Sequence, residues 1–333
     1  SKRKQLFGTS DEPTLLFYIR VSRKIFWNRP AGVIVHVGYG LVMMLKIFSP
    51  RLKIIYYHHG TSLHTKLNPS QWEKLNKNIV GLISVNEIAI KKVINTFNSG
   101  ESHVKYFTLY NAILPLINSN EIENESKLAR ISLNIEKDDF VITYSGRICK
   151  EKGVLNLIKA FEIVSKIHSK AKLNIIGGPG TAKYLENGLK YMELCKRYCK
   201  DKNINVNFTG YLTPDVLKVY LLASDVIVLP TDPSLSEEGL SLSLIEGLSL
   251  GKPLIATDSG GNKEIVYDGV NGFIIPYDLN YHKQLAIKLD DLICNKDLHT
   301  SFSKKSLELF NNKFSYFIYQ NNFKKILTEI NFL

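Results

Sequence analysis

Residues 140–153 read FVITYSGRICKEKG, a short apolar run followed by a glycine and a basic turn that leads into a helical pattern. The same order recurs along the chain. Expected strands cover residues 32–37, 53–57, 79–85, 104–109, 140–145, 172–176, 206–208, 226–229, 253–256 and 272–275. Helical patterns lie between them, for example at 153–169, 182–200, 215–223 and 240–250. This alternation predicts an α/β fold with doubly wound parallel sheets.

The length of the chain, 333 residues, favours two domains over a single core. The most polar break, residues 118–127, follows Pro115 and precedes a new strand, which is typical of an interdomain linker. We therefore expect a first domain at 1–117, a linker at 118–135, a second domain at 136–312 and a closing C-terminal helix at 313–333. The first domain shows four expected strands and the second six, so the first is expected to lack an opening strand and turn.

Composition narrows the class of protein. Hydrophobic residues make up 44% and charged residues 22%, as in a globular domain, and four cysteines are too few for a disulfide scaffold. Cys195 and Cys199 lack a second Cys/His pair at zinc spacing, so reduced thiols are expected. The apolar run at 32–48 is interrupted by His36 and Lys46 and is shorter than the ~20 residues of a bilayer span. Without a signal peptide, these features predict a cytoplasmic protein.

Positive charge is concentrated in the first third of the chain. Residues 1–120 hold 16 Lys/Arg against 5 Asp/Glu, whereas residues 121–333 hold 27 against 26. Such a domain suggests an anionic partner, either a membrane surface, a lipid-phosphate acceptor or nucleic acid, although simple solubility is an equal alternative. Residues 17–29 (FYIRVSRKIFWNR) fit an interfacial helix or a core helix with a basic outer face. No nucleic-acid-binding signature is present, so no nucleic-acid partner is expected.

Two acidic residues stand out in the stretch PTDPSLSEEGLSLSLIE at 230–246. Glu238 should precede a helix that begins near Gly239–Leu240, and Glu246 should lie about two turns inside it. A helix N-terminus suits a phosphate, and a carboxylate beside it can accept hydrogen bonds from sugar hydroxyls. The alternative is a helix cap and a solvated face, but the leucines around Glu246 predict burial, and a buried carboxylate needs a partner.

Arg147 and Lys152 follow the strand at 140–145, and parallel sheets bind ligands at the carboxyl ends of their strands. These cations could clamp a diphosphate, or they could belong to an ordinary basic turn. The glycine-rich segments at 38–40, 177–180 and 247–252 match neither a P-loop nor a dinucleotide fingerprint. No Asp-x-Asp pair occurs, so no metal site for a nucleotide diphosphate is expected.

Two histidines end the expected strand at 53–57. Because His58 and His59 alternate, only one can point to a given side of the sheet. Either could also be an ordinary surface histidine.

Taken in order, the motifs GR-x4-KG, GGPG, F-x-G-Y, ASD-x4-P, EGL-x5-E and DSGG-x2-EI resemble those of the family-four glycosyltransferases with the GT-B fold. The resemblance implies two Rossmann-like domains that face a cleft and a retaining, metal-independent transferase of hexosyl or N-acetylhexosaminyl groups. The donor would be a nucleotide-diphosphate sugar, with UDP as the expected nucleotide, and no other cofactor is implied. The basic first domain, with its aromatic helical segment, then suggests a lipid-linked or cell-envelope glycan at the inner face of the membrane as the acceptor.

The resemblance also assigns roles to residues at matching positions. Arg147 and Lys152 would hold the diphosphate, Glu246 the ribose and Glu238 the donor sugar. Backbone N–H groups near Gly239, Leu240 and Ser241 would bind phosphate, and Gly210, Tyr211 and Leu212 would border the base. His59, or failing it His58, would touch the sugar near the reacting carbon, and Asn111 matches an Asn of the family.

The sequence departs from the family pattern at 239–241, at 111–114 and in the missing opening loop. Two other functions therefore stay open. One is a non-catalytic glycosyltransferase-like partner subunit, and the other is a GT-B sugar-nucleotide epimerase.

Overall fold

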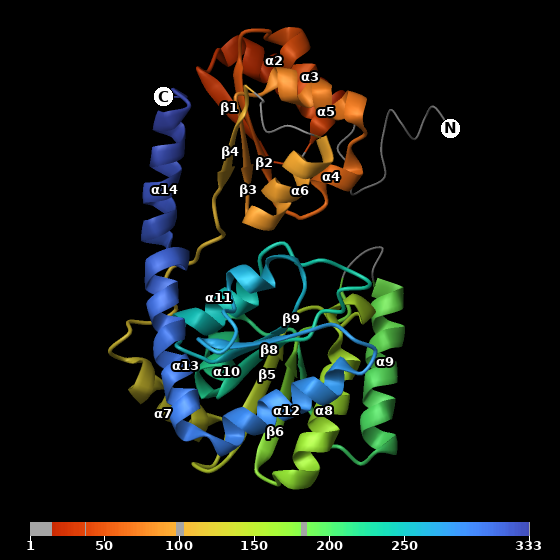
Figure 1. The fold of residues 1–333 in the computed structure, drawn as a ribbon, viewed down its shortest axis with the longest axis vertical. Helices are drawn as coiled ribbons and strands as arrows, with labels where there is room; N and C mark the ends of the chain where they lie inside the picture. The colour runs from red at the N-terminus through yellow and green to blue at the C-terminus, as the bar shows by residue number, and fades with distance from the viewer. Residues whose placement is uncertain (1–14, 37, 98–102, 181–184, 333) are drawn as a thin grey trace. The chain divides into compact units, whose positions relative to one another are not determined.

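The structure is a computed structural model that describes residues 15–36, 38–97, 103–180 and 185–332. The chain divides into two compact units (Figure 1). The first contains Ser1–Tyr110 together with Gln320–Leu333, and the second contains Asn111–Tyr319. The fold class is the expected one, because each unit carries a parallel sheet with helices between successive strands.

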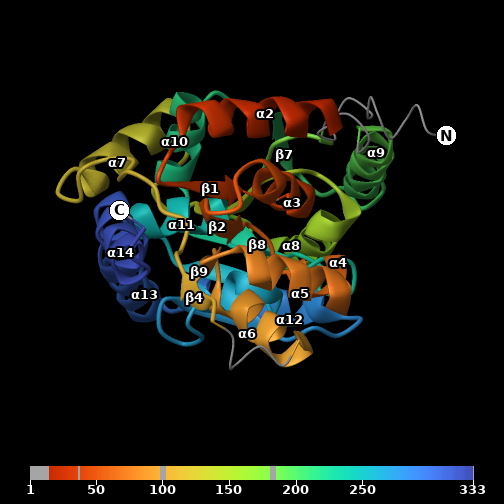
Figure 2. The ribbon, with the colours of Figure 1, turned by 90° about the horizontal axis from the view of Figure 1, so that it is seen from above.

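Within its described residues, the first unit has a four-stranded parallel sheet in the order β1-β2-β3-β4. The strands are β1 (Gly32–His36), β2 (Lys53–His58), β3 (Gly81–Ser84) and β4 (Lys105–Thr108). The helices are α2 (Leu15–Asn28), α3 (Tyr39–Phe48), α4 (Leu63–Lys66), α5 (Pro69–Asn78) and α6 (Glu87–Phe97). Helix α2 packs on α3, as the view in Figure 2 also shows.

Consecutive strand order explains the core of this unit. Right-handed crossovers that all step in one direction place α3, α5 and α6 on the same face of the sheet. The hydrophobic cluster joins Leu45 of α3, Trp72 of α5 and Val93 of α6 to Tyr56 of the sheet. The opposite strand positions, such as Ile83, are buried as well.

The end of the chain packs against the first unit. Phe332 lies so close to Gly32 that a Cβ at this glycine would meet the phenyl ring. Lys53 Nζ donates to the carbonyl of Asn331, and Lys105 Nζ donates to the carbonyl of Glu329 at 2.8 Å. These contacts explain why residues 320–333 cluster with residues far away in the sequence.

The second unit has a six-stranded parallel sheet in the order β10-β9-β8-β5-β6-β7 among its described residues. The strands are β5 (Phe140–Ser145), β6 (Ala171–Ile176), β7 (Asn207–Gly210), β8 (Val226–Leu229), β9 (Leu254–Thr257) and β10 (Gly272–Ile275). The main helices are α8 (Val154–Ile167), α9 (Leu185–Asp201), α10 (Pro214–Ala223), α11 (Leu242–Ser249), α12 (Tyr281–Cys294) and α13 (Lys296–Leu309). Every residue of β8 and β9 is buried, as expected for strands with both faces covered.

The expected linker at 118–135 is not an irregular segment. It contains helix α7 (Ile122–Ser132), which belongs to the second unit. Arg130 of α7 donates to Asp225 at 3.0 Å and to the carbonyls of Glu136 and Asp139. The polar composition of this stretch reflects the exposed face of a surface helix, which is why it could be taken for a linker.

The closing helix also begins differently from the expectation. A π-helical turn at Phe310–Phe314 separates α13 from α14 (Tyr316–Glu329). Near this turn, the N–H of Ile113 donates to the carbonyl of Phe314, and the N–H of Tyr316 donates to the carbonyl of Ile113. Helix α14 is divided between the two units: its residues up to Tyr319 cluster with the second unit, and its later residues cluster with the first.

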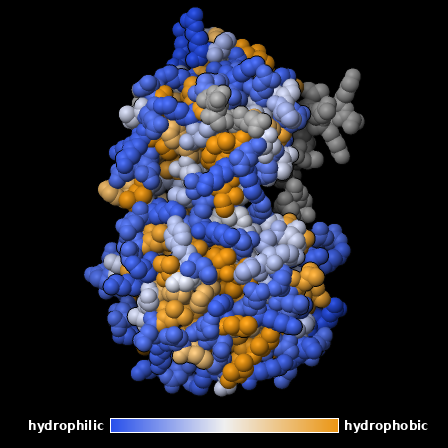
Figure 3. Space-filling view, in the orientation of Figure 1, coloured by the Kyte–Doolittle hydropathy of each residue, from blue (hydrophilic) through white to orange (hydrophobic). Residues whose placement is uncertain are grey.

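The long apolar run at 32–48 is split between strand β1 and helix α3. In the described parts of the chain, every helix is too short or too polar to cross a membrane. On the face shown in Figure 3, hydrophilic residues surround separate apolar patches.

Candidate active site

The order of the second sheet reverses between β5 and β8. Strand β5 pairs with β6 on one side and with β8 on the other, so the chain winds outward in both directions from this point. The loops that follow two such strands separate at their carboxyl ends and leave room for a ligand. Here these are the loops at 146–153 and 230–241, which contain the two clusters picked out from the sequence.

The structure joins those loops through an ion pair. Lys152 Nζ lies 2.5 Å from Glu238 Oε1, and the side chains are 21% and 10% exposed. The hydroxyl of Thr231 donates to the same carboxylate oxygen. Among the described residues, Glu238 Oε2 has no hydrogen-bond partner, and Lys152 uses one of its three donors. The pair can therefore still bind a polar ligand.

Glycines hold Glu238 in place. Gly260 has φ +49°, and a Cβ there would collide with the carbonyl oxygen of Glu238. The N–H of Gly261 donates to that carbonyl at 2.9 Å, and the hydroxyl of Ser259 accepts from the N–H of Glu238 at 3.3 Å. The first glycine of the DSGG motif is thus needed for the close approach of the two backbones.

Lys152 is positioned by the glycine that follows it. Gly153 adopts φ +66°, and a Cβ there would overlap the carbonyl oxygen of Pro230. That carbonyl accepts from the Tyr281 hydroxyl at 2.9 Å. The close approach brings the loop after β5 against the loop after β8, and it explains why a glycine ends the GR-x4-KG motif.

Helix α11 starts two residues later than expected. Its first residue is Leu242, with Ser241 as the N-cap, so Gly239 and Leu240 lie in the preceding loop and are not part of the helix. Free helix N–H groups therefore begin at Ser241 and Leu242. The difference arises because the leucine pattern continues through the loop, where Leu240 is buried.

Glu246 lies about one turn inside α11 and is half-buried. Burial raises the pKa of its carboxyl. Among the described residues, this carboxylate has no hydrogen-bond partner, whereas the backbone carbonyl of Glu246 accepts from Ser249. A partly desolvated carboxylate without a donor from the protein can accept hydrogen bonds from ligand hydroxyls.

Arg147 is exposed on the loop after β5, and the structure fixes its backbone. The buried Tyr144 hydroxyl donates to the carbonyl of Arg147 at 2.6 Å. Gly177 has φ +123° and is so close to Gly146 that a Cβ there would overlap the Gly146 carbonyl oxygen. The guanidinium is therefore carried on a loop whose backbone is held in place directly after the carboxyl end of β5.

The three residues at 210–212 lie beside the glycine loop that follows β6. Gly210 ends β7 and accepts from the N–H of Gly177 at 2.9 Å. The ring of Tyr211 packs against Gly178, and its hydroxyl accepts from the N–H of Gly180 at 3.1 Å. Tyr211 remains 64% exposed, so its ring is accessible to a ligand such as a base.

In the first unit, the two histidines differ sharply. His59 is exposed, its Nε2 lies 2.7 Å from His36 Nδ1, and its ring stacks on Tyr57 at 4.4 Å between ring centroids. His58 is 3% exposed, and neither of its ring nitrogens has a partner among the described residues. Burial, with smaller effects of Lys66 and the neighbouring histidines, lowers the pKa of His58 to about 4.

Asn111 is the first residue of the second unit and lies close to the start of α11. Its side-chain N–H donates to the carbonyl of Leu240 at 3.4 Å. Thr231 and Ser259, which position Glu238, were not singled out from the sequence. The signal that could have found them is their place, since each is the second residue after the end of a strand, β8 for Thr231 and β9 for Ser259.

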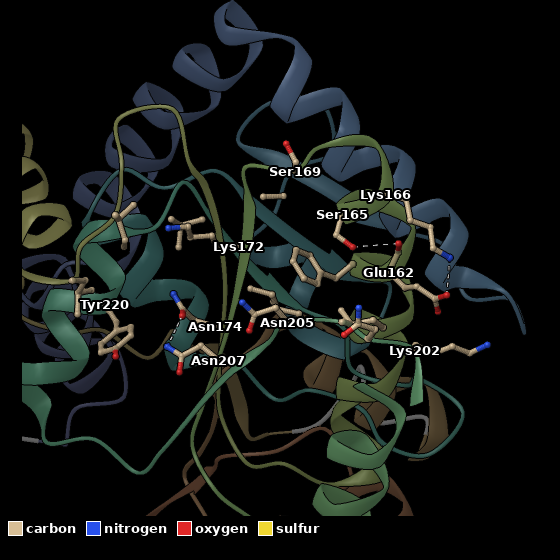
Figure 4. A pocket seen from close by; sticks show the side chains of 18 residues that line it. Glu162, Ser165, Lys166, Ser169, Lys172, Asn174, Lys202, Asn205, Asn207 and Tyr220 are labelled. Carbon is tan, nitrogen blue, oxygen red and sulfur yellow. Dashed lines mark hydrogen bonds and ion pairs between the residues drawn. The ribbon is translucent and has the colours of Figure 1, made fainter. Parts of the chain in front are cut away.

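A separate cavity of about 560 Å³ lies elsewhere in the second unit (Figure 4). Its lining includes Lys172, Asn174, Asn205, Asn207 and Tyr220, and the Asn207 amide donates to Asn174 at 2.9 Å. None of the clustered cations or carboxylates described above lines it. The strands line this cavity mainly with residues from their N-terminal halves, whereas the candidate site lies at their carboxyl ends.

Comparison with solved structures agrees with the fold. The structure of Anabaena HepE in complex with UDP and glucose superimposes with a TM-score of 0.74 over 94% of this chain and 81% of that chain, at 17% identity. Trehalose-6-phosphate synthase OtsA gives a TM-score of 0.73 over 95% of this chain and 76% of that chain, at 13% identity. The two parallel sheets thus have the GT-B glycosyltransferase fold.

The sequence places the chain more specifically. The family described as "Glycosyl transferases group 1" matches residues 125–308, more than half of the chain, and the protein belongs to this family. Lipopolysaccharide 1,2-N-acetylglucosaminetransferase of Salmonella typhimurium is 28% identical over 54% of this chain and 48% of its own length. CapM of Staphylococcus aureus, a capsular polysaccharide biosynthesis glycosyltransferase, is 28% identical over 70% of this chain and 57% of its own length. The chain thus spans about half of the length of these relatives.

Proposed function

We propose that the protein transfers a sugar from a nucleotide-diphosphate sugar to an acceptor hydroxyl with retention of the anomeric configuration. The observation that carries the proposal is the cluster at the strand-order reversal of the second sheet. There the Lys152–Glu238 pair lies between two loops, Arg147 is on the first loop, and an unpartnered carboxylate, Glu246, is on the helix that follows the second.

The groups match the parts of a nucleotide sugar. Arg147 and Lys152 would stabilise the diphosphate as its charge develops, and the N–H groups at the start of α11 would add fixed positive dipoles. Glu246 would accept hydrogen bonds from the ribose hydroxyls, which would give this half-buried carboxylate its donors. Glu238 Oε2 would accept from the donor sugar. Because two cations already meet the diphosphate, the proposal requires no metal ion.

UDP is the nucleotide that we propose. The relatives and neighbours include proteins whose names specify N-acetylglucosaminyl transfer or a complex with UDP. Tyr211 offers an exposed ring for stacking on the base, with Gly210 and Leu212 beside it. The transferred group would be a hexosyl or N-acetylhexosaminyl residue.

The acceptor would be a lipid-linked or cell-envelope glycan, met on the cytoplasmic side of the membrane. Names of relatives such as CapM support a role in polysaccharide assembly. The basic first unit supports contact with an anionic membrane, because Phe17, Phe26 and Trp27 of α2 are exposed beside its arginines. His59 would act from this unit on the donor sugar. Flotation with anionic vesicles at low and high salt tests the membrane contact. Failure of the protein to bind the vesicles even at low salt would refute it.

The transfer itself is tested by incubating the protein with UDP-sugars and following UDP release and product stereochemistry. The proposal predicts slow hydrolysis without acceptor and a product of unchanged anomeric configuration with one. An epimerase would convert the sugar in the absence of any acceptor, and a non-catalytic subunit would bind the nucleotide sugar without releasing UDP.

A further inference from the structure

Three side chains of types that bind metals lie together at the C-terminal ends of helices α8 and α12. His168 follows the last residue of α8, and Asp290 and Cys294 lie four residues apart near the end of α12. Residues at this spacing share one face of a helix. One ligand atom from each of the three residues lies within 4.8 Å of the others.

The distances within the cluster suit a small tetrahedral ion. Zinc bonds of about 2.0–2.1 Å to nitrogen or oxygen and about 2.3 Å to sulfur place neighbouring ligand atoms roughly 3.3–3.7 Å apart. Cys294 Sγ lies 3.6 Å from Asp290 Oδ1, which is already this spacing. His168 Nε2 lies 2.5 Å from the same oxygen in a hydrogen bond. That pair needs to open by only about 1 Å to admit the ion.

The chemistry of the three groups selects among metals. A thiol, an imidazole and a carboxylate together form a ligand set for zinc, whereas magnesium and calcium prefer oxygen atoms alone. The helices that carry the ligands pack against each other, so the frame is built before an ion arrives. Asp290 and Cys294 also line an open cavity of about 520 Å³, which leaves room for a water molecule as the fourth ligand.

We propose that His168, Asp290 and Cys294 bind one zinc ion at the surface of the second unit. On binding, the Cys294 thiol loses its proton to solvent and the ion replaces the hydrogen bond between His168 and Asp290. Helix α8 begins directly after Gly153 and has 14 residues, so the ion would lie about 20 Å from Lys152. It would therefore link the ends of two helices and stabilise the unit, without contact to the donor.

The test uses the whole chain in a non-thiol reductant, with Co²⁺ as a spectroscopic probe. Co²⁺ should produce a thiolate-to-cobalt charge-transfer band with a stoichiometry of one, and an equivalent of Zn²⁺ should abolish it. Cys294→Ser should remove the band, and His168→Ala should weaken Co²⁺ binding at least about tenfold. Asp291→Asn changes the same charge on the neighbouring residue, which pairs with Lys288, and should leave the band unchanged.

Thermal unfolding gives a second readout. Zn²⁺ should raise the midpoint of the wild-type protein and of Asp291→Asn but not that of Cys294→Ser, whose exposed position should leave the metal-free fold intact. The proposal is overturned if Co²⁺ gives no charge-transfer band, or if the band persists in Cys294→Ser. Neither result would affect the proposed transferase activity, because no donor-binding residue takes part.

Discussion

Lys152 Nζ lies 2.5 Å from Glu238 Oε1, although 86 residues separate the two in the sequence. Both side chains are largely buried, so each compensates the charge of the other. The pair also fixes the distance between the loops that follow β5 and β8. In the proposed complex, this arrangement would make a cation available to the diphosphate and keep a carboxylate close to the sugar that the diphosphate carries.

Replacing Lys152 should therefore affect catalysis and stability together. In Lys152→Ala, UDP release from a UDP-sugar should slow by about 10²–10³-fold, since a preorganised charge at the leaving group is lost. Glu238 would be left without its cation, at a cost of about 3 kcal/mol in the free energy of unfolding. Kinetics and urea unfolding measure the two effects. Lys150→Ala, in the same turn but exposed, should change neither, and equal rates for the two variants would contradict the assignment.

Glu246→Gln tests the ribose contact. Removing the charge should weaken UDP binding by about 10–100-fold, the value of one to two charged hydrogen bonds, as measured by calorimetry. Glu308→Gln removes an exposed carboxylate from α13 and should bind UDP normally. Unchanged affinity in Glu246→Gln would show that this carboxylate does not meet the nucleotide.

The same residue predicts a pH dependence. Burial raises the pKa of Glu246 in the ligand-free protein, so its carboxylate is protonated at a higher pH than an exposed one. A protonated carboxyl accepts hydroxyl hydrogen bonds poorly, and UDP affinity should fall on acidification before other carboxylates titrate. Glu246→Gln should show a flatter affinity profile over the same range. Parallel profiles for the two proteins would argue against the mechanism.

Alanine substitutions at two glycines with positive φ distinguish the effect of backbone strain from the effect of a steric clash near Glu238. Gly260→Ala should place a methyl group against the Glu238 carbonyl, displace this residue and weaken UDP-sugar turnover at least about tenfold. Gly269→Ala has a similar backbone conformation, φ +72°, but no atom within 4 Å of the added Cβ. It should cost only about 1–2 kcal/mol of stability and leave turnover unchanged. A matching loss of turnover in both variants would point to general destabilisation.

His58 should make the first unit sensitive to acid. Its pKa falls from 6.5 when unfolded to about 4 when folded, so the unfolded chain binds more protons between these values. The stabilisation is complete above pH 6.5 and is lost as the pH falls toward 4, by up to roughly 3 kcal/mol. Tryptophan fluorescence reports on this unit, because Trp27 and Trp72 both belong to it. His58→Gln should flatten the dependence of unfolding on pH, whereas the exposed-site change His59→Gln should retain it.

The strands were predictable because parallel strands with both faces covered are continuous apolar runs. Strand β5 has the expected bounds, and β8 at 226–229 does as well. The prediction of a linker at 118–135 was wrong because α7 exposes most of its side chains. Composition alone does not distinguish such a surface helix from an irregular segment. The start of α11 was placed too early because buried Leu240 continues the leucine pattern beyond the helix.

The site was partly accessible to sequence reasoning. The positions of Arg147 and Lys152 after a strand indicated a ligand site, but their link to Glu238 depends on strand order, which periodicity does not reveal. The roles of Gly153 and Gly260 in close backbone packing likewise required the third dimension. Thr231 was missed because one threonine after a strand carries no distinguishing pattern.

The most direct test of the central claim is calorimetric titration of the chain with UDP, repeated with Lys152→Ala and Glu246→Gln. We expect saturable binding at one site, weakened at least about tenfold in each variant. Absence of heat with UDP, GDP and ADP alike, or the same affinity in all three proteins, would contradict it.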